Sequence, residues 1–498
     1  MNSTQDIFAH ESGAAWLKKP IPFVLMILSL AAIGSIVGQR GMITGFAFMF
    51  LPFIAVYFYF IFKEPKIGIY GLFFCNYFIL GFARYIKGLP LGMSVDFHLV
   101  IILVALFFKS FFHEIPWKNA KNELFYIVLI WFAWIVFQII NPEAISRVAW
   151  FYSMRSIGLY MLLVVPLIFI VFNSVNDLKH FFHIWAVFAI IGAVKGIIQK
   201  HIGLDPFEHA WLMGPAKDTH LLFGKLRVFS FFTDAGQFGA SMGYSGVVFL
   251  ILALNQKYSI KLKIFYAIVG VLSIYGLMIS GTRGSIAVPV MGFALYIALQ
   301  RNIKIIVLGV ILGASVFVFF KYTTIGQSNY TIARMRTAFN PEDKSLQVRL
   351  ENQRKLKVYM ASRPIGAGIG ATGRQAAMAA PNSMASQVPT DSWYVIVWVE
   401  QGIVGLTLHL LMLFYIVLKS SYVIAFKLKN PWIKAQMAAL VSGMFGIMVA
   451  SYGNAVLGQM PTVIIFYSSM AFLFLAQKYD EEMPGEQQSK IQLATNER

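Results

Sequence analysis

The chain has 498 residues, of which 58% are hydrophobic and only 13% are charged, and its mean hydropathy is +0.68. Because soluble proteins carry about 25% charged residues, these values exclude an ordinary soluble enzyme. The net charge of +19 invites a nucleic-acid-binding interpretation, but the distribution of the charges argues against that class. The single cysteine, Cys75, excludes an intramolecular disulfide.

Apolar stretches of about 20 residues recur along the chain, and each is long enough to cross a hydrocarbon core about 30 Å thick. We therefore predict an all-α polytopic membrane protein with about 14 transmembrane helices. The alternating segments typical of a porin-like barrel are absent from the sequence. Residues 1–20 carry Lys18 and Lys19 before the first apolar run, but no small-residue cleavage site follows, so we expect a retained first helix. The predicted spans begin near Ile21, Gly41, Ile67, Asp96, Leu124, Ser156, Phe182, Ala235, Leu262, Arg283, Ile303, Ser392, Ala435 and Met460.

Lysine and arginine are unevenly divided between the two sides of these spans. Twenty lie on the segments of one side and six on the short loops of the other. Since positive residues mark the cytoplasmic side, we predict a multi-pass protein of the bacterial inner (cytoplasmic) membrane with both termini in the cytoplasm. The predicted parts are a cytoplasmic N-terminus (1–20), transmembrane helices (21–199), an outer loop (200–234), further helices (235–320), a long basic periplasmic loop (321–391), C-terminal helices (392–477) and a cytoplasmic, disordered tail (478–498).

The loop 321–391 holds 10 Lys and Arg against 4 Asp and Glu, and loops of such length are usually functional or disordered. Within it, residues 345–364 predict a helix that Pro364 ends. Arg349 faces packed protein or a site if this helix forms, because it shares an apolar stripe. A basic helix resting on anionic lipid headgroups is the alternative. The stripe consists of Leu346, Arg349, Leu356 and Met360.

The stretch "PIGAGIGATGR" follows, with glycines at 366, 368, 370 and 373. It imitates a phosphate-binding glycine loop, but the strand and helix that a dinucleotide fingerprint needs are not evident around it. We predict a tight turn whose exposed amides contact an anion.

The predicted topology gathers several charged residues on the outer membrane face. Each of them alone could be a helix cap or a side chain reaching the interface, whereas their convergence indicates a site. They are Arg227, Asp234, Arg283, Arg349 and Asp391. The outer face is therefore where we expect function.

Glu400 lies deeper, nine residues into the span after Asp391 and about 13 Å along a straight helix. A carboxylate in a membrane usually has a partner, and Lys195 is one candidate for an ion pair. His409 is expected to be a packed core histidine. No His, Cys, Asp and Glu cluster shows the spacing of metal ligands, so we expect neither metal nor cofactor.

Four stretches in this order resemble the O-antigen ligase and Wzy-type polymerase family of bacterial membrane glycosyltransferases. They are "RVFSFFTDAGQFGASM" (227–242), "SGTRGS" (280–285), "VRLENQRKLKVYMASRPIGAGIGA" (348–371) and "TDSWYVIVWVEQGIVGL" (390–406). The resemblance covers roughly the C-terminal half, and the order of these loose motifs around one long outer loop is its specific part.

The resemblance implies a GT-C-like all-helical fold and a reaction at the outer face on glycan carried by undecaprenyl diphosphate. Polymerases join that glycan to another lipid-linked repeat unit of O-antigen, capsule or exopolysaccharide, and ligases join it to lipid A–core. It also implies that Arg283 and Arg349 hold the diphosphate, with Arg227 as a weaker basic position. We add Asp234, Arg354, Arg363, Gly366 and Gly368 as candidate substrate-binding residues.

The sequence departs from the ligase pattern at one position. Ligases have His-Asn where this chain has Asp391-Ser392, followed in both by nine residues and Gly-x-x-Gly, here Gly402 and Gly405. The histidine expected to orient or deprotonate the acceptor is therefore replaced, which favours a polymerase. We predict Asp391 as the general base, with Asp234 second, and arginines in place of a metal ion at the departing diphosphate.

Two other classes of membrane protein are compatible with the sequence. A flippase or secondary transporter would suit many spans, but such proteins often show two similar halves, and the sequence shows no internal repeat. A structural membrane subunit, working with other polysaccharide-assembly proteins, would leave the inward-facing Arg349 unexplained.

Overall fold

The computed structural model describes residues 42–86, 90–214, 216–222, 224–340 and 342–483, with single positions and short pieces between 24 and 38. The described part is helical apart from one antiparallel pair of two-residue strands, β1 (Leu221–Leu222) and β2 (Lys225–Leu226). The prediction of an all-α fold is confirmed. The predicted first span near Ile21 and the N-terminal segment 1–20 lie largely outside the described residues.

The helices occur close to the predicted starting points, because long apolar runs dictate them locally. The first half contains α3 (Met42–Lys63), α4 (Pro65–Phe82), η1 (Leu91–Met93), α5 (Ser94–Lys109), η2 (Trp117–Ala120), α6 (Glu123–Phe137), η3 (Gln138–Ile140), α7 (Arg147–Met154), η4 (Arg155–Leu159), α8 (Tyr160–Val171), α9 (Val175–His201), α10 (Pro206–Leu212) and α11 (Lys217–His220). The second half contains α12 (Ala235–Ala253), α13 (Ile260–Ile279), η5 (Arg283–Ile286), α14 (Ala287–Leu299), α15 (Ile303–Tyr322), α16 (Tyr330–Arg336), η6 (Thr337–Phe339), α17 (Lys344–Met360), α18 (Gly373–Ala379), α19 (Met384–Gln387), α20 (Trp393–Phe426), α21 (Pro431–Ala450), α22 (Thr462–Phe474) and α23 (Ala476–Glu482).

Fewer helices of the described chain than the predicted 14 qualify as membrane spans by their length and composition. Among the described residues, nine helices are long and apolar enough to span, or ten if the bent pair α22 and α23 is one span. Several predicted spans, α4 and α14 among them, are apolar but too short to meet that criterion. The polar tail predicted from residue 478 begins as helix, because α23 continues to Glu482.

Helix α12 lies at the centre of the bundle, and nearly all its residues are buried. Glycines let its neighbours approach: a Cβ at Gly243 would lie 2.8 Å from Leu277 on α13 and 3.1 Å from Val288 on α14. Likewise Gly446 of α21 packs on the backbone of Val288. This packing brings the α13–α14 junction next to the first turn of α12 and the end of α21.

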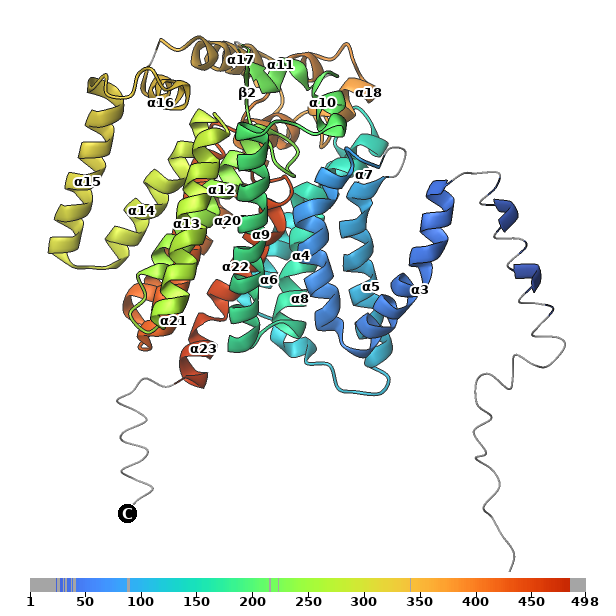
Figure 1. The fold of residues 1–498 in the computed structure, drawn as a ribbon. Helices are drawn as coiled ribbons and strands as arrows, with labels where there is room; N and C mark the ends of the chain where they lie inside the picture. The colour runs from blue at the N-terminus through green and yellow to red at the C-terminus, as the bar shows by residue number, and fades with distance from the viewer. Residues whose placement is uncertain are drawn as a thin grey trace, which may run out of the picture.

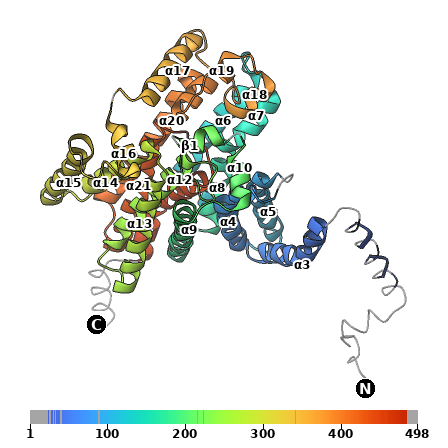
Figure 2. The ribbon, with the colours of Figure 1, turned by 45° about the horizontal axis from the view of Figure 1, so that its top comes forward.

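The short helices gather at one end of the bundle. In Figures 1 and 2, α10, α11, α16, α17 and α18 lie together over the ends of the long helices. They come from the two segments predicted as outer loops. The residues expected to share one face therefore do share one end of the molecule.

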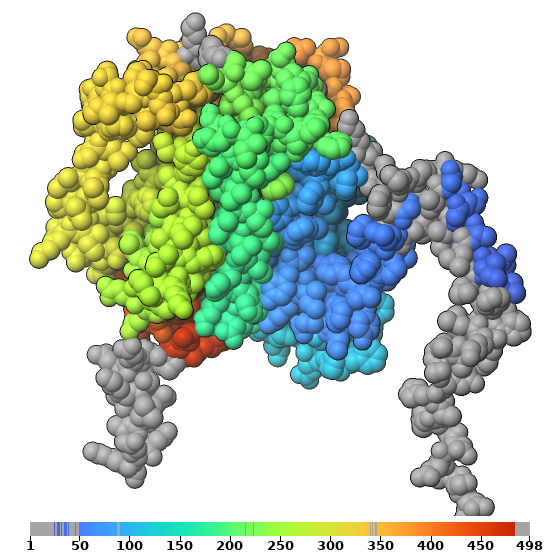
Figure 3. All heavy atoms as spheres, in the orientation of Figure 1, coloured from blue at the N-terminus to red at the C-terminus, as the bar shows by residue number. Residues whose placement is uncertain are grey.

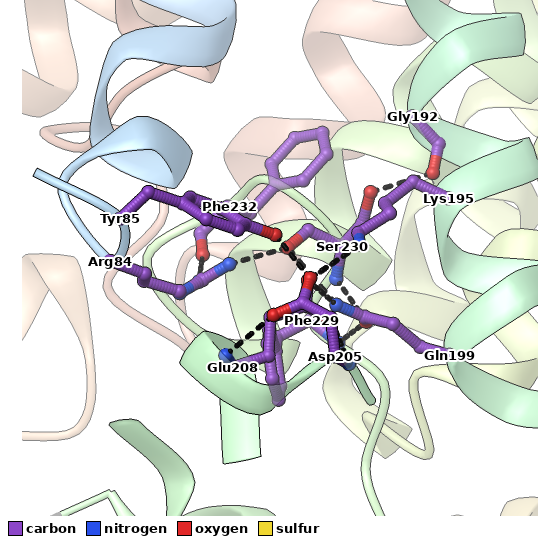
Figure 4. A network of polar contacts seen from close by, with 10 residues as sticks. All are labelled: Arg84, Tyr85, Gly192, Lys195, Gln199, Asp205, Glu208, Phe229, Ser230 and Phe232. Atoms are coloured by element: carbon purple, nitrogen blue, oxygen red, sulfur yellow. Dashed lines mark hydrogen bonds and ion pairs between the residues drawn. The ribbon is translucent and has the colours of Figure 1, made fainter. Parts of the chain in front are cut away.

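A polar network fastens the first of these segments to the bundle (Figure 4). Lys195 of α9 forms ion pairs with Asp205 at 3.2 Å and with Glu208 at 3.0 Å. Gln199 accepts from the backbone N–H of Ser230 at 2.7 Å, and Arg84 donates to the carbonyl of Ser230 at 2.5 Å. Lys195 is therefore not the partner of Glu400, and that predicted ion pair is wrong.

Helix α20 bends sharply at Gly402, whose φ of 69° and ψ of −170° are not helical. The indole of Trp393 donates to His409 at 2.9 Å, although 16 residues of straight helix would separate them by about 24 Å. The depth expected for Glu400 on a straight helix therefore does not hold. Its carboxylate accepts from the Thr372 hydroxyl at 2.7 Å, so its partner is a hydroxyl group, and His409 is buried as expected.

Helix α15 stands apart from the bundle. None of its residues is buried, and the space-filling view shows a hollow between it and the neighbouring helices (Figure 3). Its apolar surface therefore faces lipid on nearly every side if the chain lies in a bilayer.

Candidate functional site

Arg283 lies in η5, where the chain turns from α13 into α14. Its side chain is only 17% exposed and donates to the Thr337 hydroxyl at 2.8 Å. It also forms an ion pair with Asp343, one residue before α17. The segment predicted as the long outer loop therefore folds over this junction, and a carboxylate of that segment neutralises the arginine that stands between the two apolar helices.

A cavity of about 370 Å³ opens beside Arg283. Its polar lining comes from the side chains of two arginines, an aspartate, a threonine and an asparagine. Its apolar lining comes from η5, α14, α17 and α21. The polar lining is Arg283, Thr337, Asn340, Asp343 and Arg349, and the apolar lining includes Ile286, Ala287, Val290, Met291, Leu346 and Val449.

Arg349 reaches this cavity from α17, as the apolar stripe predicted. Leu356 and Met360 of that stripe are buried and anchor the helix, while Leu346 lines the cavity. The Nε of Arg349 lies 3.7 Å from a carboxylate oxygen of Asp391. A Cβ built at Gly453 would lie 3.7 Å from Cα of Gly284 and 4.0 Å from a terminal nitrogen of Arg349, so Gly453 lies close to both residues.

Asp391 thus joins the site through Arg349 and is not part of the cavity lining. It has a positive φ of 28°, which is uncommon for a residue with a side chain. Strained backbone of this kind clusters at functional sites. The carboxylate is 44% exposed and therefore accessible to solvent.

The sequence prediction missed Asp343. One of its carboxylate oxygens accepts from the backbone N–H of Leu346 at 3.1 Å, and the other meets Arg283. It therefore acts both as the cap of α17 and as the counter-charge of the site. An aspartate directly before a predicted helix is the signal that could have found it.

Arg227 lies on the other side of the same junction. It donates to the Thr282 hydroxyl at 2.8 Å and to the carbonyl of Thr219 at 2.9 Å. Burial, followed by the charge of Arg334, lowers the pKa of Arg227 to about 10, so the group stays protonated at neutral pH. Thr282 links it to the residue next to Arg283.

Asp234 is the N-cap of α12. Its carboxylate accepts from the backbone N–H of Gln237 at 2.9 Å and from the Thr233 hydroxyl at 3.1 Å. Each oxygen therefore has one local donor, as the cap interpretation expects. A role of Asp234 as general base stays a prediction.

The remaining predicted residues lie away from the cavity. Arg354 is exposed on α17, and Arg363 donates to Glu143 at 3.0 Å. Gly366 and Gly368 are buried, with φ of 87° each, and a Cβ on them would collide with the backbone of α20 and with Ala144. The predicted tight turn occurs, but the prediction that its amides are exposed is wrong, because the glycines are buried. The anion that meets this stretch is the carboxylate of Glu400, which accepts from the backbone N–H of Thr372 at 3.2 Å.

No group of three or more His, Cys, Asp or Glu side chains that could hold a metal ion occurs in the described part of the chain. The charges that the cavity offers are guanidinium and carboxylate groups. Guanidinium groups bind phosphate oxygens in a bidentate way. A molecule that joins an anionic group to an apolar chain would therefore suit both the polar and the apolar lining residues.

A family model described as O-antigen ligase matches residues 268–410. Three of the four stretches that carried the resemblance, residues 280–285, 348–371 and 390–406, lie within that range, and residues 227–242 precede it. An "O-antigen polymerase" from Salmonella muenchen is 25% identical over 193 residues, which are 38% of this chain. The predicted resemblance to the O-antigen ligase and Wzy-type polymerase family is confirmed.

The matched stretch spans about half of that relative, 46% of its length. The region that the family model matches, residues 268–410, runs from α13 through α17 to just beyond the bend in α20. It therefore contains Arg283, Asp343, Arg349 and Asp391, but neither Arg227 nor the network around Lys195.

Proposed function

We propose that the protein is a glycosyltransferase of the bacterial inner membrane that polymerises surface polysaccharide repeat units at the periplasmic face. Its donor is an oligosaccharide linked to undecaprenyl diphosphate, and its acceptor is another lipid-linked repeat unit of O-antigen, capsule or exopolysaccharide. Both termini lie in the cytoplasm, and the reaction needs no metal ion. The alternative acceptor is lipid A–core, which would make the protein an O-antigen ligase.

The mixed lining of the cavity is the observation that carries this proposal. Arg283 and Arg349 contribute charge to it, and Ala287, Val290 and Met291 of α14 contribute apolar surface. A lipid diphosphate needs both: cations for the phosphates and an apolar surface for the first part of the chain. The family match adds that all the lining residues except Val449 lie within the matched range, residues 268–410.

In this proposal the arginines stabilise the leaving group. An acceptor hydroxyl oxygen attacks the anomeric carbon, the bond from that carbon to the phosphate oxygen breaks, and undecaprenyl diphosphate leaves with the electron pair. Arg283 and Arg349 hold the charge that develops on the phosphate. Because these charges are in place before the reaction, they favour the transition state without reorganisation. Arg283 exchanges its contact with Asp343 for the donor.

Asp391 takes the proton of the acceptor hydroxyl. It stands where ligases have histidine, and it is paired with Arg349, which lines the cavity. A carboxylate beside an arginine is a weak base, but this suffices when the leaving group is good and the proton moves late. Attack opposite the phosphate inverts the anomeric centre.

Replacing Asp391 with asparagine is expected to lower turnover by about 10²- to 10⁴-fold, the usual contribution of a general base. Asparagine tolerates the positive φ of this position, so the fold and the donor affinity should be kept. Chain elongation and donor binding measured on the same purified variant would test this. A variant with normal turnover would remove Asp391 from the mechanism, and Asp343→Asn would be examined next.

Two observations favour the polymerase over the ligase. Asp391 replaces the histidine of the ligase pattern, and the similar Salmonella protein is an O-antigen polymerase. Purified protein in lipid vesicles, given lipid-linked repeat units alone, is expected to produce a ladder of longer lipid-linked chains. Product that forms only when lipid A–core is added would establish the ligase. Movement of intact donor across the vesicle membrane without any new glycosidic bond would support the transporter instead.

A further inference from the structure

Arg334 is a third arginine at the junction that holds Arg283, and nothing in the motifs pointed to it. It lies on α16, and its Nε donates to the carbonyl of Gly281 at 2.9 Å. A Cβ built at Gly281 would lie 3.4 Å from Nε of Arg334 and 3.6 Å from Cγ of Arg227. Two arginine side chains therefore cover one glycine, two residues before Arg283.

The three guanidinium groups repel one another. Burial lowers the pKa of Arg334, and the charge of Arg283 lowers it further, against the opposing effects of Tyr330 and Asp343. Two carboxylates, Asp234 and Asp343, lie near the cluster. Both carboxylates also accept from a helix N-terminus. Three guanidinium groups against two carboxylates leave an excess of positive charge, and a bound anion would reduce the repulsion.

The terminal nitrogens of Arg334 are available for such an anion. In the part of the chain that the structure describes, the protein bonds this side chain through its Nε alone. The single bond holds the guanidinium against Gly281, whose φ is 61°. Four N–H donors on the two terminal nitrogens thus remain for a phosphate group, in the fork geometry that guanidinium offers.

We propose that Arg334 is a further anion-binding residue of this site, and that it contacts the diphosphate of the lipid-linked donor together with Arg283. The inference rests on the proposed function for the identity of the donor, but its chemistry is that of a diphosphate. It also gives α16 a role: the outer loop supplies a phosphate ligand from this helix as well as Arg349 from α17.

Arg336 offers a matched control on the same helix. It donates to the carbonyl of Ile325 at 2.5 Å and to the Thr323 hydroxyl at 3.3 Å, and its guanidinium lies 5.2 Å from the ring centre of Phe319. The guanidinium of Arg336 is therefore bound by residues at the end of α15 and just after it. Removing it tests the general effect of one lost positive charge on α16.

The experiment is a calorimetric titration of the full-length protein in detergent with inorganic pyrophosphate and with geranylgeranyl diphosphate, at low and at high salt. Arg334→Gln is expected to weaken the binding of both probes about tenfold or more, since hydrogen bonds to charged groups contribute strongly. Arg336→Gln should bind as wild type does, and Arg334→Lys should fall between. The thermal unfolding midpoint of each variant reports whether the fold is kept.

Equal losses for the Arg334→Gln and Arg336→Gln variants, or none for Arg334→Gln, would overturn the inference, as would a wild-type protein that binds neither probe. If Arg334→Gln does not fold, the charge-retaining Arg334→Lys decides, because wild-type affinity in that variant contradicts a directed contact. The proposed function fails separately: a wild-type protein that binds both probes through Arg334 but never extends a lipid-linked glycan would keep the inference and lose the polymerase.

Discussion

Replacing Arg283 with alanine is expected to abolish the long-chain surface glycan in a strain that depends on this protein. The variant loses a cation at the leaving group, and removal of one such group typically costs about 10²- to 10³-fold in rate. It also leaves the carboxylate of Asp343 without its ion pair inside the loop. Glycan profiles of a deletion strain complemented with each variant, at matched protein levels, would measure this.

Arg374→Ala is the control for this experiment. Arg374 is exposed on α18 and lies outside the cavity lining, so its loss removes one outer arginine without touching the site. Arg283→Lys should restore part of the activity, because lysine keeps the charge and loses the bidentate geometry. A normal glycan ladder from Arg283→Ala would contradict the proposed site. Precursor trapped inside the cell on deletion would then favour the transporter.

Replacing Gly402 with alanine is expected to prevent stable folding of the outer loop on the bundle. The φ of 69° and ψ of −170° belong to a region that is essentially restricted to glycine, which costs about 1–3 kcal/mol for other residues. A Cβ would in addition collide with the carbonyl of Pro364 and with the backbone of Gly366. Lower expression and a lower thermal unfolding midpoint in detergent would show both effects together.

Gly313→Ala serves as the matched substitution. Gly313 lies in the exposed helix α15, and nothing would lie within 4 Å of an added Cβ. Alanine favours helix over glycine by about 1 kcal/mol, so this variant should be unchanged or slightly more stable. If Gly402→Ala were equally well tolerated, the sharp bend of α20 would not be required for the fold.

The order and type of the elements could be predicted from the sequence, because apolar runs and helix signals act over a few residues. The helix carrying Arg349 was predicted as 345–364 and occurs as Lys344–Met360, with Leu356 and Met360 buried as the stripe required. The convergence of Arg283, Arg349 and Asp391 at one end of the molecule followed from topology alone. The predicted number of spans did not take helix length into account: α4 and α14 are apolar but short.

Only the tertiary structure decided the partners of the charged side chains, since these contacts join segments that are far apart in the chain. The pairing of Arg283 with Asp343 and of Arg334 with Gly281 spans more than fifty residues in each case. The bend at Gly402 likewise decided that Glu400 meets Thr372 and not Lys195. Hydropathy and helix periodicity report where a residue sits on its own helix. Which loop folds over that helix depends on packing between distant glycines and side chains, and no local pattern records it.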